Sequence, residues 1–300
     1  MKHIVIAGGS GFIGTALANI LHSSGYKVYV LSRKESKEFE TYSRIQWDAT
    51  SEGEWAKYID SASAVIQLTG ANVGTKRWSE QYKSEILSSR VVSTSLLVSV
   101  INKSSSPPEA FISASGVGYY GDSPHSVICD EYQKNGNDFL ARVCSQWENA
   151  TVTLRNDVRK VIIRIGVVLD PNEGALAKLA LPYKFFVGGS LGSGSQMFSW
   201  IHREDLVNVF MFAITTTTVQ GIYNASAPNP VTMKEFSSTI GNVLHRPSIF
   251  PVPSFALQLL LGEMSTIVLC GQNAPPLRLL EEGFRFEYEK IEPAIRNLLQ

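Results

Sequence analysis

The chain has 300 residues, of which 44% are hydrophobic and 18% charged, and its 27 basic residues balance its 27 acidic ones. This composition excludes general disorder, and the balanced charge gives no indication of binding to nucleic acid or to an anionic membrane. The three cysteines, at positions 129, 144 and 270, are widely spaced, which indicates a reducing compartment without a disulfide framework or a metal site of the C-x-x-C kind. We find no signal peptide and no stretch of about 18 apolar residues, and therefore expect a cytoplasmic protein without a membrane span.

The chain opens with an apolar strand over His3–Ala7, a glycine turn and a helix over Thr15–Leu21. Such a turn is tight, lets the backbone approach a pyrophosphate, and presents the free N–H groups of the helix N-terminus. The glycines at 8, 11 and 14 are spaced differently from the G-x-G-x-x-G fingerprint, and a purely structural turn is the alternative. Their place directly after an N-terminal strand favours a dinucleotide site.

Strands and helices then alternate, which predicts a Rossmann-like, doubly wound parallel sheet with its ligand at the carboxyl ends of the strands. The further predicted strands are Lys27–Leu31, Ser43–Trp47, Ala64–Leu68, Ala110–Ser113 and Val161–Val168, and the further predicted helices are Gln81–Ile101, Asp138–Val152 and Leu206–Ile214. The pattern loosens beyond Leu169. We expect a cofactor domain over residues 1–170 and about 200–228, and a smaller substrate lobe over 171–199 and 229–300 that closes with the amphipathic segment Ile291–Leu299. The glycine-rich loop Gly188–Gly194 would contribute to the substrate pocket.

The second strand ends in Ser32, Arg33 and Lys34, where an NAD site usually has an acidic residue. A guanidinium can pair with the 2′-phosphate of NADP and a serine can add a hydrogen bond, while a solvated basic loop is the alternative. Asp48 follows the third strand, where it could meet the adenine amino group or cap the next segment.

Two further places are expected beside the cofactor. Leu68, Thr69 and Gly70 end the fourth strand, where glycine lets the backbone run close to a ribose, although this could also be an ordinary turn. Glu85 and Arg90 are five residues apart on a helix, so they do not share one stripe and could belong to a solvated face.

The combination of these motifs resembles the atypical or extended short-chain dehydrogenases/reductases. Within them it is similar to the nucleoside-diphosphate-sugar epimerase-like subgroup, whose members are also labelled SulA-like epimerase family proteins. The segments that carry this resemblance are GGSGFIG, SRK, LTG, ISASGVGYYGD, KRW (Lys76–Trp78), FLARVCSQWE, RIGVVLD, FSWIHREDL and a C-terminal extension from about Arg246 to Gln300. The resemblance covers essentially the whole chain.

The resemblance implies an NADP-binding protein with a small-molecule substrate. The cofactor contacts that it implies are Gly8, Gly9, Ser10, Gly11, Phe12, Ile13, Gly14, Ser32, Arg33, Leu68, Thr69, Gly70, Glu85, Arg90 and Val168. Glu85 would accept from a ribose hydroxyl and Arg90 would meet a phosphate or order the loop. Val168 could pack on the nicotinamide or be a plain core residue.

The catalytic residues of the superfamily are only partly present. Active members use a serine or threonine together with Tyr-x-x-x-Lys on one helix, where lysine lowers the pKa of the tyrosine that exchanges the proton. The matching helix here has neither tyrosine nor lysine, and Leu140 and Cys144 occupy their positions. Ser115 matches the serine, and Tyr119 and Tyr120 are the tyrosines that could replace the missing one. His202 is a weaker candidate base, and Asp205 is expected to be a helix N-cap.

Two classes of function remain open. One is an NADP-dependent oxidoreductase or epimerase-like enzyme with an altered acid–base set, and the retained Ser115 and substrate lobe favour it. The other is a non-catalytic NADP-binding sensor or regulatory protein, which the loss of tyrosine and lysine favours. A homodimer that pairs through the helices near Gln81–Ile101 and Asp138–Val152 is a further expectation, without nucleic acid, membrane or metal.

Overall fold

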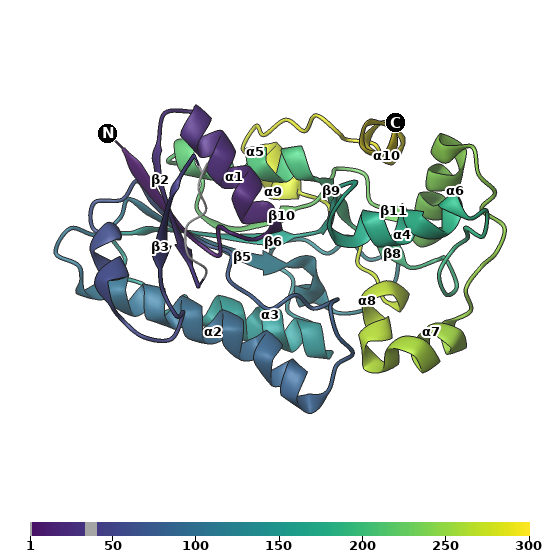
Figure 1. Cartoon of the computed structure of the whole chain (residues 1–300), viewed down its shortest axis with the longest axis horizontal. Helices are drawn as coiled ribbons and strands as arrows, with labels where there is room; N and C mark the ends of the chain where they lie inside the picture. The colour runs from purple at the N-terminus through teal and green to yellow at the C-terminus, as the bar shows by residue number, and fades with distance from the viewer. Residues whose placement is uncertain (1, 34–40) are drawn as a thin grey trace.

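The computed structural model describes residues 2–33 and 41–300, and its main layer is a seven-stranded, all-parallel sheet (Figure 1). The strand order is β10-β6-β5-β4-β1-β2-β3, so the chain turns from one side of β1 to the other and leaves a crevice between β1 and β4. The strands are β1 His3–Ala7, β2 Lys27–Ser32, β3 Ser43–Gln46, β4 Ala64–Gln67, β5 Ala110–Gly116, β6 Arg159–Ile165 and β10 Gly221–Ala225. The predicted Rossmann-like fold is confirmed.

Helices cover both faces of this sheet (Figure 1). The helices α1 (Phe12–Ser23) and α5 (Arg203–Thr215) lie on one face, and α2 (Glu80–Lys103) and α3 (Phe139–Asn149) lie on the other. Because successive strand side chains point to opposite faces, Ile4 and Ile6 of β1 pack in the first core and Val5 and Ala7 in the second. The apolar cores on the two faces of the sheet therefore hold the strand ends from which the candidate site is built.

Among the described helices, α2 alone is long and apolar enough to cross a membrane by length and composition. It packs instead as one layer of the α/β fold, with Ile86 and Leu97 fully buried. The Gln67 side chain at the end of β4 donates hydrogen bonds to Ser93 and Thr94 of the same helix. These contacts are those of a core helix.

The C-terminal lobe lies beyond the carboxyl ends of the strands and has its own core around Trp200, Phe236 and Ile240 (Figure 1). Its elements are α4 Gly174–Lys184, β8 Met197–Phe198, β9 Trp200–His202, β11 Val231–Thr232, α6 Met233–Leu244, α7 Ser254–Leu261, η3 Gly262–Ser265, α8 Thr266–Leu269 and α10 Ile291–Leu299. The predicted closing segment Ile291–Leu299 is confirmed as a helix, with α10 packed against α6. Three further elements are η1 Glu54–Tyr58, η2 Val117–Tyr120 and α9 Leu277–Glu281.

The prediction of one continuous strand over Val161–Val168 is wrong. The strand β6 ends at Ile165, and β7 (Val167–Leu169) pairs with β9 in a separate two-stranded sheet. Gly166 is the break, because a Cβ there would lie 2.7 Å from the Ser199 carbonyl oxygen. The chain leaves the main sheet at this close approach, while Val168 still packs against the core between the sheet, α1 and α5.

The predicted N-cap role of Asp205 is also wrong. His202 caps α5, since its Nδ1 accepts from the Glu204 N–H. Asp205 is fully buried and accepts from the N–H groups of Glu287 and Tyr288, at 2.8 and 3.0 Å. It therefore ties the C-terminal extension to the sheet-covering helix α5.

Candidate functional site

The glycine turn after β1 has the geometry of an anion cradle. Gly8 has a φ of +80°, and a Cβ there would lie 2.8 Å from the backbone of Leu68 and Thr69. A Cβ on Gly14 would collide with Gly9 and would lie 2.7 Å from the Gly8 carbonyl oxygen. Helix α1 begins at Phe12 without a side-chain cap and without an acidic residue in its first turn. Its first N–H groups and its dipole are therefore available to a phosphate.

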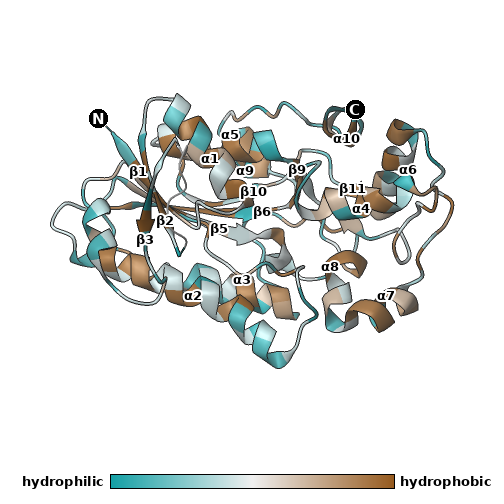
Figure 2. Ribbon diagram, viewed as in Figure 1, coloured by the Kyte–Doolittle hydropathy of each residue, from teal (hydrophilic) through white to brown (hydrophobic). Residues whose placement is uncertain are grey.

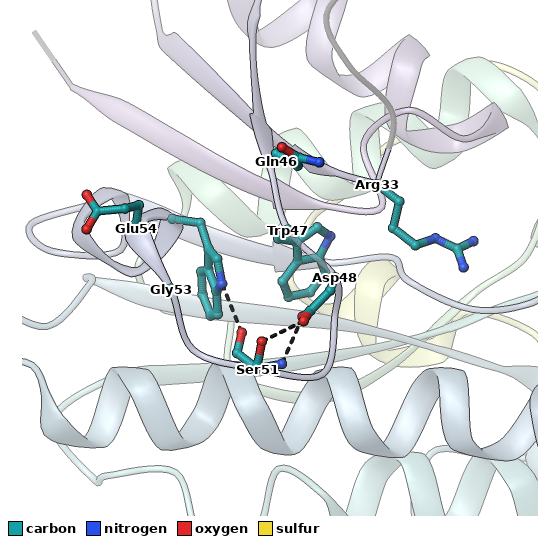
Figure 3. A pocket seen from close by; sticks show the side chains of 8 residues that line it. Arg33, Gln46, Trp47, Asp48, Ser51, Gly53 and Glu54 are labelled. Atoms are coloured by element: carbon teal, nitrogen blue, oxygen red, sulfur yellow. Dashed lines mark hydrogen bonds between the residues drawn. The ribbon is translucent and has the colours of Figure 1, made fainter.

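Three hollows run along the carboxyl ends of the strands, and Arg33 lines all of them. One of about 210 Å³ holds the glycine turn with Ser32, Leu68, Thr69 and Gly70. A second, of about 500 Å³, continues over Glu85 and Ser88 of α2. The third, of about 520 Å³, lies between β3 and η1 (Figure 3). Arg33 is exposed at the end of β2 and has no hydrogen-bond or ion-pair partner among the described residues. Its guanidinium is therefore available to a ligand.

The third hollow is lined by Asp48, whose side chain is held by hydrogen bonds within its own loop (Figure 3). The Asp48 carboxylate accepts from the Ser51 hydroxyl and from the backbone N–H groups of Thr50 and Ser51. The Ser51 hydroxyl, with the two N–H groups, holds the pKa of Asp48 far below its usual range. Ala49 has a φ of +68°, a strained backbone conformation that occurs at binding sites. The loop is therefore a preformed turn that presents a carboxylate beside the cationic Arg33.

The end of β4 also bears marks of a binding site. The Thr69 hydroxyl is buried and has no hydrogen-bond partner in the structure, although it borders two of the hollows. A buried hydroxyl without a partner is costly, so the position is suited to a bound polar group. Gly70 lies close against Arg90, since a Cβ there would be 2.8 Å from the guanidinium carbon and would require that side chain to shift.

Arg90 and Glu85 take different positions. Glu85 is exposed and lines the second hollow. Arg90 stacks over the Trp147 ring at 5.1 Å and donates to the Ile86 carbonyl oxygen, so it supports the turn at Gly70 from behind. Of the two roles considered for Arg90, ordering the loop is the one that this geometry supports.

Ser115 lies at the end of β5 in a buried ionic cluster. Its hydroxyl donates to Glu148 Oε1 at 2.7 Å, and Glu148 on α3 forms a two-point pair with Arg164 of β6, at 2.9 and 2.8 Å. Burial disfavours the charged guanidinium, but the hydrogen bonds and charge of Glu148 outweigh it, so the pKa of Arg164 rises. A hydroxyl carries one hydrogen, so Ser115 can offer only acceptor lone pairs to a ligand.

The two candidate tyrosines belong to the same cluster. The Tyr120 hydroxyl donates to Asn224 Oδ1 at 2.7 Å and accepts from Arg164 at 3.0 Å, and burial raises its pKa above the ordinary value. The Tyr119 ring lies under the Arg164 guanidinium, 3.5 Å from ring centre to carbon. Both side chains therefore hold Arg164 in place, and a raised pKa makes Tyr120 a poorer proton donor.

The positions that would hold tyrosine and lysine carry apolar or neutral groups. Leu140 faces Gly118 and belongs to an apolar cluster that includes Met264 and Ile267 of the C-terminal lobe. Cys144 packs against Gly116, and burial raises the pKa of its thiol to about 11. His202 is buried between Asn297 and Tyr288, away from these groups. The described residues contain no cluster of three or more His, Cys, Asp or Glu suited to a metal ion.

The structure brings most of the predicted cofactor residues to one groove and gives the others supporting positions. Gly9 faces Val30 of β2, while Phe12 and Ile13 lie in the first turn of α1. Val168 is half-buried on β7 near the start of α4, and Lys34 lies outside the described residues. The Glu148–Arg164 pair was missed as part of the site. Its signal was in the sequence, because an arginine inside an apolar strand requires a buried carboxylate partner.

A glycine cradle at the switch point of a parallel sheet, continued by a groove past Arg33, defines a dinucleotide-binding protein of the short-chain dehydrogenase/reductase type. The profile of the NAD dependent epimerase/dehydratase family matches residues 4–226, and that of a domain of unknown function, DUF1731, matches residues 252–298. The chain belongs to the NAD dependent epimerase/dehydratase family.

Relatives of nearly equal length show the same family. "Epimerase family protein SDR39U1 homolog, chloroplastic" of Arabidopsis thaliana is 42% identical over 99% of this chain and 86% of the relative. "Epimerase family protein YfhF" of Bacillus subtilis is 38% identical over 99% and 98%. The crystal structure of the human epimerase family protein SDR39U1 (isoform 2) with NADPH is 34% identical, covers 99% of both chains and has a TM-score of 0.91. The predicted family is thereby confirmed.

Proposed function

We propose that this chain binds NADPH in the groove that Arg33 borders and acts as an oxidoreductase in which no tyrosine supplies the proton. The observation that carries the proposal is the set of three hollows from the glycine cradle to Asp48, all lined by Arg33, whose guanidinium has no partner among the described residues. The glycine turn would hold the pyrophosphate, Arg33 the 2′-phosphate, and Asp48 the adenine amino group, while Ser32, whose hydroxyl donates to Ser10, would support the glycine turn. The human relative that was crystallised with NADPH supports this choice.

The cofactor would supply the hydride, and this chain would position it. Leu140, at the position of the tyrosine, packs with Met264 and Ile267 against one apolar cluster, so this position would be apolar. Ser115 would orient a ligand as a hydrogen-bond acceptor, since its hydrogen is given to Glu148. The proton of a reduction would therefore come from ordered water or from the substrate.

The first experiment is a fluorescence titration with NADPH and NADH, for the parent protein and for Arg33→Ala. A charge-assisted contact of this kind contributes roughly 1.5–3 kcal/mol, so NADPH should bind roughly 10- to 150-fold more weakly to the variant while NADH is unaffected. Lys2→Ala, which changes an exposed cation away from the groove, is the matched control. Equal affinity of the parent protein for both nucleotides would contradict the assignment of Arg33.

A second candidate is a non-catalytic NADP-binding sensor. It is favoured by the commitment of the Ser115 hydrogen to Glu148 and by Leu140 in the tyrosine position. Oxidation of protein-bound NADPH by a panel of carbonyl compounds distinguishes the two, with Ser115→Ala as the comparison. Turnover by the parent protein supports the oxidoreductase, and tight binding without oxidation of the nucleotide supports the sensor. The cytoplasmic location stays a prediction.

A further inference from the structure

The C-terminal lobe contains a cavity of about 400 Å³ that lies apart from the dinucleotide groove. Helices α4, α6, α7 and α8 and the strand-like segment around Leu191 enclose it, and Leu179, Phe236 and Val268 are among its lining side chains. Its volume is in the range of roughly 300–1,000 Å³ that small-molecule sites occupy. The lobe therefore has room for an organic ligand.

The lining of this cavity is apolar almost throughout. The Tyr183 hydroxyl, one of its few polar groups, already donates to the Ser237 carbonyl oxygen at 2.8 Å. No arginine lines the cavity, and Lys178 is the one charged residue of the described lining. A nucleoside diphosphate requires several cationic or N–H donors, so this cavity does not suit one. An aliphatic chain, in contrast, needs only removal from water.

Lys178 gives the cavity one cationic end. Its Nζ donates to the Gly74 carbonyl oxygen at 3.0 Å, and within the described part of the chain no carboxylate lies within 4.0 Å of it. The Lys178 side chain is exposed, so an anionic partner can reach it.

The mouth of the cavity is bordered by exposed apolar side chains. Val187 and Leu260 line the cavity and are 54% and 69% exposed. Phe186 and Leu259 beside them and Phe250 opposite Gly188 are also more than half exposed. Figure 2 shows α7 as a hydrophobic helix at the edge of the lobe. Exposed apolar side chains gathered at one opening mark a binding surface, in contrast to scattered single ones.

We propose that this cavity binds the aliphatic chain of an anionic amphiphile, with the carboxylate or phosphate head of that molecule at Lys178. The inference goes beyond the dinucleotide groove and holds whether or not that groove transfers hydride. The cavity is nonetheless adjacent to the candidate active site, because Val268 of α8 faces it while Ile267 of the same helix packs in the cluster with Leu140.

The test is a titration of the full chain with cis-parinaric acid, a fluorescent fatty acid, followed by displacement with dodecanoate, 1-dodecanol and UDP-glucose. Val268→Trp fills the cavity, and Val152→Trp makes the same substitution at an exposed position that does not line the cavity, as its matched control. Excluding two methylene groups from an apolar cavity weakens binding roughly tenfold. We therefore expect at least that loss in Val268→Trp and none in Val152→Trp.

The head group is tested with Lys178→Gln. Dodecanoate should bind roughly two- to fivefold more weakly to this variant, and 1-dodecanol should be unaffected, because an exposed ion pair contributes little. Absence of saturable binding, equal binding to Val268→Trp and the parent protein, or displacement of the probe by UDP-glucose each overturns the proposal. NADPH affinity measured on the same variants should stay unchanged, so failure here is distinguishable from failure of the dinucleotide assignment.

Discussion

Replacing Arg164 with methionine tests whether the cluster around Ser115 is a structural device. Arg164 is 1% exposed, and its guanidinium makes the two-point pair with Glu148, donates to Tyr120 and covers the Tyr119 ring. Methionine fills much of the same volume but leaves the Glu148 carboxylate buried with only Ser115 as a partner. Breaking a buried pair by removing one side costs roughly 3–5 kcal/mol.

This free energy converts to a melting shift through the size of the chain. At roughly 2.1 cal/mol/K per residue, 300 residues give an unfolding entropy of about 0.6 kcal/mol/K. Arg164→Met should therefore lower the melting temperature by about 5–8 °C. The assay is thermal unfolding followed by fluorescence, together with urea unfolding to obtain the free energy itself.

A double variant separates the charge from the packing. In Arg164→Met combined with Glu148→Gln, no unpaired charge remains, so the free energy of unfolding should recover by at least half of the loss. Arg164→Lys keeps a charge without the two-point geometry and should lie between the parent protein and Arg164→Met. A melting shift below about 2 °C for Arg164→Met, or a double variant less stable than the single one, would refute the reasoning.

Four further predictions concern other parts of the structure. Gly14→Ala should abolish NADPH binding in a fluorescence titration, because its Cβ collides with Gly9, while Gly74→Ala, whose Cβ would be 3.6 Å from the nearest atom, should bind normally. Asp205→Ala leaves two N–H groups of the C-terminal extension without acceptors, so urea unfolding should show a loss of roughly 2–3 kcal/mol. Burial lowers the pKa of His202, so the unfolded chain takes up the proton first as the pH falls. Stability should therefore drop below pH of about 6.5 by up to about 1.4 kcal/mol per unit, and His202→Asn should flatten that slope in unfolding measured from pH 7 to 5. Pairing of two copies through α2 and α3 stays a prediction, and light scattering decides it by a mass of 33.0 kDa or twice that value.

The sequence predicts the sheet well because its signals are local. The apolar run His3–Ala7, followed by a glycine turn and an amphipathic helix, specifies a βα unit without knowledge of distant residues. The break at Gly166 could not be predicted this way. It depends on the approach of Ser199, more than thirty residues later, and a run of apolar residues has the same pattern in one strand or in two.

In the candidate site, too, the residues with a local sequence signal were predictable and those placed by distant contacts were not. The glycine turn, Arg33 and Thr69 follow their strands directly, so their meeting at the carboxyl edge of the sheet was predictable. The role of Asp205 was not, because its partners, Glu287 and Tyr288, are about eighty residues away. The spacing of His202 and Asp205 at the start of a helix is equally consistent with capping by either, and only tertiary contacts decide between them.

The buried cluster also explains why a serine can be retained while the tyrosine and lysine are absent. Ser115 gives its hydrogen to Glu148, so its position contributes to an ion pair that joins β5, β6 and α3. Tyr120 extends the cluster to Asn224 on β10, whose side chain donates to carbonyl oxygens of Cys129 and Pro275. The position of the superfamily's serine is here part of a buried polar cluster that connects the sheet to the C-terminal extension. The pH–rate profile of any reduction at this site should therefore lack the ionisation of a catalytic tyrosine. The proton would come from ordered water or from the substrate itself.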